Sequence, residues 1–334
     1  MQIKILIEEY MEDFKDNIKN FTIIDAFTKA ESVIKKYSRI AVSVSGGKDS
    51  DIVVDLISSL DKDKKCRYVW FDTGIEYRAT IKHLEYLENR YGITIERYRA
   101  IKPIPKTCKD DGQPFLNKFV SEMIDTLQRH NFKWEDKSYE ELIQEYPKIK
   151  GAISWWTNHR ECGSFKNSMF NISYNKYLKE FIIQNPPKFR ISKKCCTYAK
   201  KKVSLKYIKD NNIECMVTGL RKSEGGIRSV KIKTCFDSGK DVASYRPLFW
   251  LSNEDEVEYI KIFDIKNSDC YTKYGMKRTG CAGCPYNRNL EKDLKVIEEN
   301  EPLLYIACNA IFKDSYDYTR KYRDFCKKKK GDRT

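Results

Sequence analysis

Histidine and long apolar runs are both scarce in this chain. Only three histidines occur among 334 residues, namely His83, His130 and His159. No two of them stand at the spacing of a metal site, which excludes HExxH chemistry, and we expect each to be a surface or core residue. No apolar run approaches the roughly 18 residues that a membrane span needs. The N-terminal segment carries acids throughout, unlike a secretory signal. We therefore expect a cytoplasmic protein with no membrane partner.

Acidic residues are the minority charge. The chain has 63 Lys and Arg against 48 Asp and Glu, a formal net charge of +15. Such an excess favours a polyanionic partner, either a nucleotide or a nucleic acid. The alternative is a solvated basic surface, because lysines are spread along the whole sequence and only the run Lys327–Lys330 is dense.

Cysteine is present but too dilute for a disulfide scaffold, with twelve in the chain. Four of them form a pattern. Cys195 and Cys196 are adjacent, and Cys281 and Cys284 form a CxxC 85 residues further along. Four thiolates suffice for one 4Fe–4S cluster or one tetrahedral zinc. Cys270 could replace one of the adjacent pair, and buried unreactive thiols are the alternative.

Hydrophobic periodicity predicts an α/β protein. Short β-branched runs at 40–44, 67–71 and 93–98 alternate with helical patterns at 49–60 and 77–91. This order is typical of a parallel twisted sheet flanked by helices. Two further strands are expected at 214–218 and 242–248. The predicted divisions are N-terminal helices (1–37), first half of the core (38–100), a helical insertion (101–190), second half of the core with the cysteine-ligated region (191–290), and C-terminal helices with a basic tail (291–334).

The predicted insertion is rich in Tyr, Trp and Lys. If exposed, its aromatic side chains, Trp155 and Trp156 among them, could stack on unpaired bases. The alternative is that they form an ordinary core.

A glycine-rich turn follows the first predicted strand. It comprises Ser45, Gly46, Gly47, Lys48, Asp49 and Ser50. Two glycines let the backbone approach a ligand, the following helix points free N–H groups at the turn, and Lys48 adds a cation. These features predict a phosphate-binding loop. It is not a Walker A loop, because Val42 stands where the first glycine would be and Asp49 follows the lysine.

Further candidate residues follow other predicted strands. The ligand crevice of an open parallel sheet lies at the carboxyl ends of its strands. The candidates there are Asp72, Thr73, Gly74, Gly219, Arg221 and Arg228. The two arginines could bind phosphate or phosphosulfate oxygens through paired hydrogen bonds.

These motifs together resemble a known family. Residues 45–50 resemble the PP-loop of N-type ATP pyrophosphatases, and 71–74 resemble the LDTG element of the phosphoadenosine phosphosulfate (PAPS) reductase branch. Residues 218–221 resemble the TGLR element, and the four cysteines resemble the cluster ligands of iron–sulfur adenylylsulfate reductases. The resemblance runs from about 38 to 290, interrupted at 101–190. Within this family, the chain resembles members that are associated with phages and mobile elements and proteins of DNA phosphorothioation. The resemblance implies an adenine nucleotide alpha hydrolase-like fold.

Two departures from the family refine the expectation. The C-terminal ECGLH motif of the assimilatory reductases is absent, and Cys326 is a candidate replacement nucleophile in a lysine-rich tail. Those reductases also usually lack the Lys and Asp of the loop, so Lys48 and Asp49 imply that ATP itself is bound. Sulfate adenylyltransferase small subunits keep the loop but lack the four cysteines, so the chain resembles them less well.

The resemblance therefore implies ATP-dependent adenylation coupled to sulfur transfer onto a nucleic acid or another polyanionic acceptor. Lys48, Asp49 and Arg221 would be catalytic, with ATP and Mg²⁺ bound at the loop. The cysteines would hold a 4Fe–4S cluster that binds or relays sulfur, with zinc as the alternative. A sulfur donor such as a cysteine desulfurase is an expected partner. The alternatives are a thiol-dependent reductase of adenylylsulfate or PAPS, and a non-catalytic, zinc-containing nucleic-acid-binding module.

Overall fold

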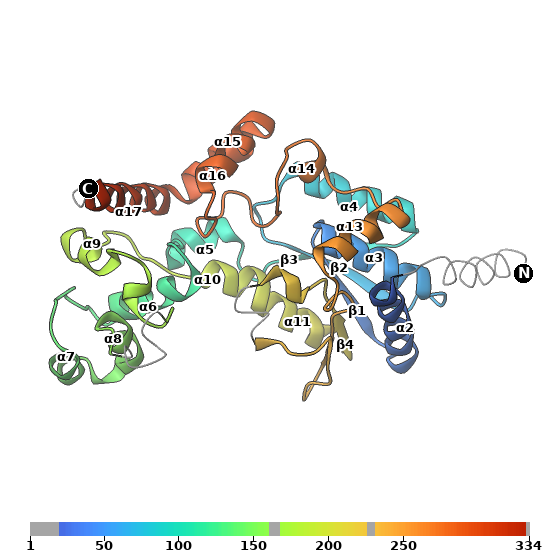
Figure 1. The fold of residues 1–334 in the computed structure, drawn as a ribbon, viewed down its shortest axis with the longest axis horizontal. Helices are drawn as coiled ribbons and strands as arrows, with labels where there is room; N and C mark the ends of the chain where they lie inside the picture. Colours follow the sequence, from blue (N-terminus) through green and yellow to red (C-terminus); the bar gives the residue numbers. More distant parts are fainter. Residues whose placement is uncertain (1–19, 160–167, 226–230, 332–334) are drawn as a thin grey trace, which may run out of the picture. The chain divides into compact units, whose positions relative to one another are not determined.

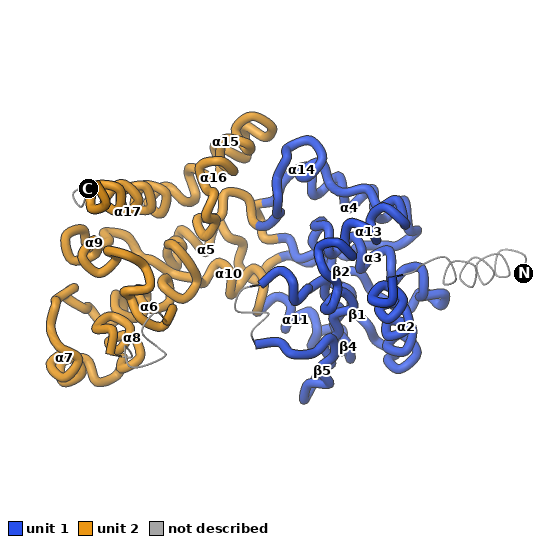
Figure 2. The backbone as a smooth tube through the Cα atoms, viewed as in Figure 1, with its two compact units in different colours: residues 1–72, 76–99, 202–280 blue, residues 73–75, 100–201, 281–334 orange. Residues whose placement is uncertain are grey.

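The computed structural model describes residues 20–159, 168–225 and 231–331. The chain forms two compact units, each assembled from separate stretches of sequence (Figure 2). Unit 1 comprises Met1–Asp72, Glu76–Arg99 and Lys202–Gly280, and unit 2 comprises Thr73–Ile75, Ala100–Lys201 and Cys281–Thr334. The finer five-part division predicted from sequence stays a prediction.

Unit 1 is built on a six-stranded sheet with the order β3-β2-β1-β4-β6-β5 (Figure 1). The strands are β1 (Ile40–Val44), β2 (Cys66–Asp72), β3 (Ile95–Arg99), β4 (Cys215–Val217), β5 (Phe236–Asp237) and β6 (Ala243–Tyr245). All neighbouring strands pair in parallel except β5, which runs antiparallel to β6 at the edge. The predicted α/β class with a mostly parallel sheet is confirmed, and the antiparallel edge strand was not predicted.

Helices cover both faces of this sheet. They are α2 (Phe21–Lys36), α3 (Lys48–Leu60), α4 (Arg78–Tyr91), α11 (Lys202–Asp210), α13 (Asn253–Ile262) and α14 (Asp269–Thr272). Successive residues of β1 point to opposite faces, as strand geometry requires. Val42 joins the core under α2, α3 and α13, whereas Ala41 joins a smaller core with Tyr207 of α11. Burial on both faces explains why the central strands read as continuous apolar runs.

Unit 2 is helical. Its elements are α5 (Ile104–Asp111), α6 (Lys118–Arg129), α7 (Tyr139–Glu145), η1 (Pro147–Ile149), α8 (Lys150–Trp156), η3 (Ile172–Tyr174), α9 (Leu178–Gln184), α10 (Lys194–Cys196), the π-helical turn η4 (Thr197–Lys201), α15 (Leu290–Asn300), α16 (Pro302–Ile311) and α17 (Lys313–Gly331). The described part of the predicted insertion (101–190) is therefore helical, and its only strand-like pairing is an isolated bridge from Gln113 to Ile191, the residue just after the insertion.

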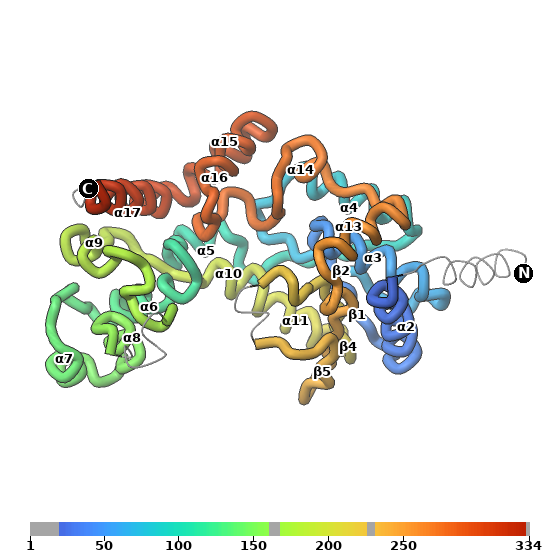
Figure 3. The backbone as a smooth tube through the Cα atoms, in the orientation of Figure 1, coloured from blue at the N-terminus to red at the C-terminus, as the bar shows by residue number. Residues whose placement is uncertain are grey.

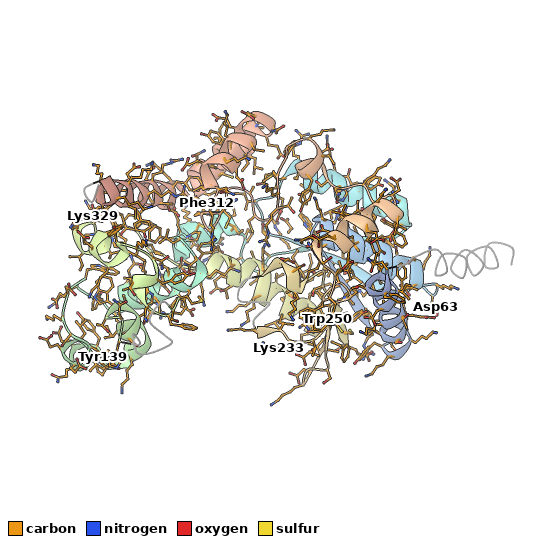
Figure 4. All side chains as sticks on the ribbon, in the orientation of Figure 1. Asp63, Tyr139, Lys233, Trp250, Phe312 and Lys329 are labelled. Carbon is orange, nitrogen blue, oxygen red and sulfur yellow. The ribbon has the colours of Figure 1, made fainter. Side chains whose placement is uncertain are left out.

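The C-terminal helix completes the core of the insertion. Tyr318 and Tyr322 of α17 pack against Phe181 of α9, so two segments of unit 2 that are far apart in the sequence lie side by side (Figure 3). Lys329, near the end of α17, forms an ion pair with Glu180 of α9 (Figure 4). The residues predicted as a basic tail are thus helical as far as Gly331.

The tryptophans of the insertion are core residues. Trp155 is 1% exposed and Trp156 is fully buried. The indole Nε1 of Trp156 donates to the Glu135 carbonyl at 2.8 Å. The prediction that these two rings stack on bases is therefore wrong, because neither presents a free face. No helix in the described ranges is both long and apolar enough to cross a bilayer.

Candidate nucleotide site and cysteine centre

Strand order defines where unit 1 can bind a ligand. The chain passes from β1 through α3 to β2 on one side, and β4 and β6 lie on the other side of β1. In open parallel sheets a ligand crevice forms at this reversal, outside the carboxyl ends of the strands. The predicted loop 45–50 follows β1, and the segment with Gly219 and Arg221 follows β4. The fold therefore brings these two motifs, far apart in sequence, to one place.

Gly219 marks how closely the two segments approach. A Cβ atom at Gly219 would lie 2.9 Å from both the carbonyl carbon and the carbonyl oxygen of Asp49. Gly46 has φ +67°, and a Cβ there would lie 2.9 Å from Thr80 Cγ2. Gly219 has no room for a side chain. Gly46 has no room either, and its positive φ also favours glycine.

The side chain of Ser50 stabilises the loop through hydrogen bonds to its backbone. Its Oγ accepts from the backbone N–H of Ser45 at 3.1 Å and of Gly47 at 3.2 Å, and donates to the Gly47 carbonyl at 2.9 Å. Because α3 begins at Lys48, its first N–H groups and positive dipole end face this loop. The loop therefore has the local geometry of an anion site.

Lys48 is flanked by two residues that sequence reasoning missed. Its Nζ lies 5.1 Å from the ring centroid of Tyr271, whose hydroxyl is 3.0 Å from Thr279 Oγ1. Both oxygens would be 3.2 Å from a Cβ at Gly47. Burial raises the pKa of Tyr271, so this hydroxyl stays neutral near pH 7. These residues stand more than 220 positions after the loop, and no sequence pattern links them to it.

The half-buried Asp49 forms a charge network with the buried Arg221 and Glu256. Arg221 is 6% exposed, and its Nε donates to Asp49 Oδ1 while its Nη2 donates to Glu256. Burial raises the pKa of Asp49 to about 6; Arg221 opposes this shift and Glu256 adds to it. The other guanidinium nitrogen, Nη1, donates to Ser223, Asn253 and the Ser252 carbonyl. Arg221 is thus placed to position Asp49, and its contact with phosphate stays a prediction.

A second buried acid lies just beyond the loop. Asp51 is fully buried, and its Oδ2 lies 2.8 Å from Nε2 of His83, itself 6% exposed. Burial raises the pKa of Asp51, and the hydrogen bond with His83 partly offsets this. His83 is a core residue, as expected from its spacing, but its acidic partner was missed because α3 and α4 meet only in the fold.

The remaining nucleotide candidates divide between the units. Asp72 ends β2 in unit 1, whereas Thr73 and Gly74 are counted with unit 2. The Thr73 carbonyl accepts from Ile104 N–H at 2.8 Å, and Gly74 has φ +82°, where a Cβ would lie 2.8 Å from Pro103 Cβ. Arg228 lies outside the described residues. The roles predicted for these residues stay predictions.

The four predicted cysteines all belong to unit 2. Cys195 and Cys196 form the end of α10, and Cys281 and Cys284 bracket a turn closed by a 3.3 Å hydrogen bond from Cys284 N to Cys281 O. Gly283 within the turn has φ +59°, and a Cβ there would lie 2.7 Å from Cys308 Sγ. Its carbonyl accepts from the buried hydroxyl of Tyr316. Close packing against α16 and α17 therefore fixes the CxxC turn.

Several of these thiols affect one another's pKa. Burial raises the pKa of Cys284 to about 12, and the charges of Cys281 and Cys196 add to that rise. A hydrogen bond with Cys195 raises the pKa of Cys196, followed by burial, while Lys118 and Lys200 oppose the shift. A hydrogen bond with Cys108 is the largest cause of the raised pKa of Cys195. Cys108, on α5, was missed by sequence analysis because it stands alone in its segment.

The fit of these cysteines to a metal group is partial. Thiols are the donors that iron–sulfur clusters and structural zinc use. As placed in the described ranges, no three His, Cys, Asp or Glu side chains form a group that could hold a metal. A shared cluster therefore requires the four thiols to draw together. Cys270 is counted in unit 1, where its Sγ lies 3.8 Å from Thr80 Oγ1. Cys326 lies on α17, 3.6 Å from the Lys176 carbonyl.

Fold and loop together define the class of protein. A parallel sheet with a glycine-rich loop and a helix start at its reversal point is an α/β nucleotide-binding architecture. Residues 39–287 match the model of the phosphoadenosine phosphosulfate reductase domain. The chain therefore belongs to the PAPS reductase domain family, as the motifs predicted.

Individual relatives are more remote. A 62-residue stretch, 18% of this chain, is 43% identical to an uncharacterized protein of Methanocaldococcus jannaschii, and it spans only 12% of that protein's length.

Solved structures also resemble the chain. PAPS reductase from Candida auris in a phosphate complex is 12% identical over 82% of this chain and 94% of its own, with a TM-score of 0.42. The NH3-dependent NAD synthetase of Campylobacter jejuni is 12% identical over 89% and 94%, with a TM-score of 0.37. The U34-tRNA thiolase of Methanococcus maripaludis with its 4Fe–4S cluster is 13% identical over 88% and 78%, with a TM-score of 0.34. These scores are too low to add to the family assignment.

Proposed function

We propose that this member of the PAPS reductase domain family binds ATP with Mg²⁺, cleaves it between the α- and β-phosphates, and couples the adenylation to sulfur transfer. The observation that carries the proposal is the pair Lys48 and Asp49 at the start of α3, at the reversal point of the sheet. A protein that bound only a preformed adenylate would have no pyrophosphate to hold at this loop.

The loop residues divide the work by charge. Free N–H groups at the start of α3 and the Lys48 ammonium would neutralise the pyrophosphate. Asp49 would help to hold Mg²⁺, because hard cations prefer carboxylate oxygens. Its pKa of about 6 leaves it mostly ionised at neutral pH. Arg221 would keep the Asp49 carboxylate in place through the hydrogen bond to Oδ1.

Cys195, Cys196, Cys281 and Cys284 would hold a 4Fe–4S cluster in unit 2 or, alternatively, a zinc ion. A cluster would supply a site for binding or relaying sulfur. The acceptor on this proposal is a nucleic acid, for which the support is the net charge of +15. The second candidate function is a reductase of adenylylsulfate or PAPS, which the family name favours.

Nucleotide binding separates the two candidates. Calorimetry with ATP·Mg²⁺ and with adenylylsulfate is expected to show binding of ATP. Lys48→Ala should weaken that binding by about 1.5–3 kcal/mol, the range for hydrogen bonds to charged groups. Lys82→Ala, which removes an exposed lysine of the same unit, serves as the matched control and should leave the affinity unchanged.

Release of pyrophosphate on adding an acceptor is the second readout. Binding of adenylylsulfate without binding of ATP would favour the reductase. If neither nucleotide binds, the zinc-containing nucleic-acid-binding module becomes the remaining candidate.

A further inference from the structure

Cys108 is a buried thiol that the proposed nucleotide chemistry does not use. It lies on α5 and is 4% exposed, and its interaction with Cys195, itself 3% exposed, is the largest cause of the raised pKa of the Cys195 thiol. α5 packs directly on α10, the helix that carries Cys195 and Cys196.

This packing is built into the backbone of unit 2. Gln113 N donates to the Arg190 carbonyl at 2.9 Å, and Ser192 N donates to the Gln113 carbonyl at 2.9 Å. These bonds tie the chain after α5 to the chain before α10. Gly112 has φ +100°, and a Cβ there would lie 2.4 Å from the Arg190 carbonyl oxygen, so only glycine allows this approach. An ion pair of 2.9 Å between Lys194 and Asp111 adds a side-chain link.

A cavity of about 510 Å³ opens beside Cys108. This volume lies within the usual range for small-molecule sites, about 300–1,000 Å³. The cavity is lined from α5, from the segment before α10, and from α16 and α17, all in unit 2. The lining residues used below are Cys108, Lys109, Asp110, Arg190, Ala310 and Asp314.

The charges around the cavity are mixed. Lys109 and Arg190 are basic, whereas Asp110 and Asp314 are acidic. Asp110 already pairs with Lys102, and Arg190 with Asp125. A small molecule with both an ammonium and a carboxylate group would therefore meet Asp314 and Lys109, whereas a simple anion would be repelled by the two carboxylates. The thiol of Cys108 is the nucleophile among these groups.

We propose that this cavity admits a small zwitterionic persulfide to Cys108, which takes the terminal sulfur and holds it beside Cys195. The inference rests on the sulfur-transfer part of the proposed function. The step is an exchange: the Cys108 thiol attacks the outer sulfur of R–S–SH, the donor S–S bond breaks, and a new S–S bond forms. The products are Cys108–S–SH and R–SH, which takes the proton from Cys108. No electrons are gained or lost. Because Cys108 is 4% exposed, a donor carried on another protein is too large to reach it.

The test maps where sulfur is added. Full-length protein is treated anaerobically with cysteine persulfide, alkylated, digested and analysed by mass spectrometry. We expect the added sulfur on Cys108 before it appears on the other cysteines. Cys108→Ser should lose this product, and Ala310→Trp, which narrows the cavity and removes no thiol, should slow it. Cys215→Ser removes a buried thiol of β4 in unit 1 and should change nothing.

The outcomes separate this inference from the proposed function. Absence of persulfide at Cys108, or an unchanged rate in Ala310→Trp, would overturn the proposed access through the cavity. A polysulfide-loaded desulfurase that modifies Cys108 as fast as cysteine persulfide would also overturn it. Loading of Cys108 needs neither ATP nor a cluster. Failure of ATP binding would therefore remove the proposed function and leave this result standing.

Discussion

At the scale of single residues, Asp49 is subject to opposing forces. Burial raises its pKa to about 6, and the charge of Glu256 acts in the same direction, while Arg221 lowers it. A carboxyl whose pKa is higher in the folded chain binds its proton more tightly when folded. The stability that it contributes is therefore complete below its unfolded pKa and is lost as the pH rises through about 6.

Asp49→Asn removes this titration while keeping the shape of the side chain. The free energy of unfolding of the natural chain, minus that of the variant, should fall as the pH rises from about 5 to about 7.5. Urea unfolding at several pH values measures this difference. Asp63→Asn, at an exposed position in the turn after α3, is the control and should show no such slope in this range. A difference that grows with pH would mean that Arg221 lowers the pKa of Asp49 more than burial raises it.

The residues of the loop could be predicted because they are contiguous. Glycines, lysine and a helix start within six positions indicate a turn with the geometry of an anion site, and phosphate binding there stays a prediction. Glu256, Tyr271 and Cys108 could not be predicted, because each meets its partner only after the chain has folded. Cys108, for example, reaches Cys195 across 87 positions of sequence, through a glycine turn that has no motif.

At the scale of elements, periodicity predicted five of the strands of unit 1 and its helices α3 and α4, but missed α5 of unit 2. This helix begins beside Pro103 and Pro105 and buries only Ile104, Thr107 and Cys108, too few for an apolar stripe. The antiparallel strand β5 was missed for a similar reason, since it has two residues. Short elements are specified by the neighbours that pack on them, which a single sequence does not display.

The cysteines of α10 and of the CxxC turn are the expected ligands of a 4Fe–4S cluster. Protein purified anaerobically should contain iron and sulfide in a ratio of about 4:4, as a 4Fe–4S centre requires. Cys284→Ser should lose the cluster and its absorbance, because the half-buried Cys284 would be a ligand. Cys308→Ser removes a buried neighbour of the same turn and is expected to keep the iron.

Loss of iron should also destabilise the turn, because metal affinity at such a site is also folding energy. Thermal unfolding with and without a chelator measures this contribution. Colourless protein with one bound zinc would mean that these cysteines hold a structural zinc ion and no cluster. Iron retained in Cys284→Ser would exclude this ligand set.

At the scale of the whole chain, some of the lysines that make up the positive charge are already in ion pairs. In the tail, Lys327 pairs with Asp324 at 3.2 Å, and Lys329 pairs with Glu180. Exposed pairs of this kind contribute little to stability, about 0–1 kcal/mol, so a polyanion can compete for the lysines. The buried tryptophans leave phosphate binding, rather than base stacking by those rings, as the expected source of nucleic-acid affinity.

Binding to DNA and to tRNA should therefore weaken steeply between about 50 and 200 mM salt, because each neutralised phosphate releases counterions. Lys328→Gln with Lys330→Gln should reduce the log–log slope by about 0.7–0.9 for each phosphate that these lysines neutralise. The matched control is Lys292→Gln with Lys295→Gln on α15, which removes the same charge from the same unit. Equal reductions in the two double variants would mean that the whole basic surface acts as a diffuse field and that the end of α17 binds no particular phosphate. A slope near zero in the natural chain would exclude a nucleic-acid acceptor. The sulfur acceptor would then have to be a small molecule, because a polyanion of several phosphates would show a salt-dependent slope.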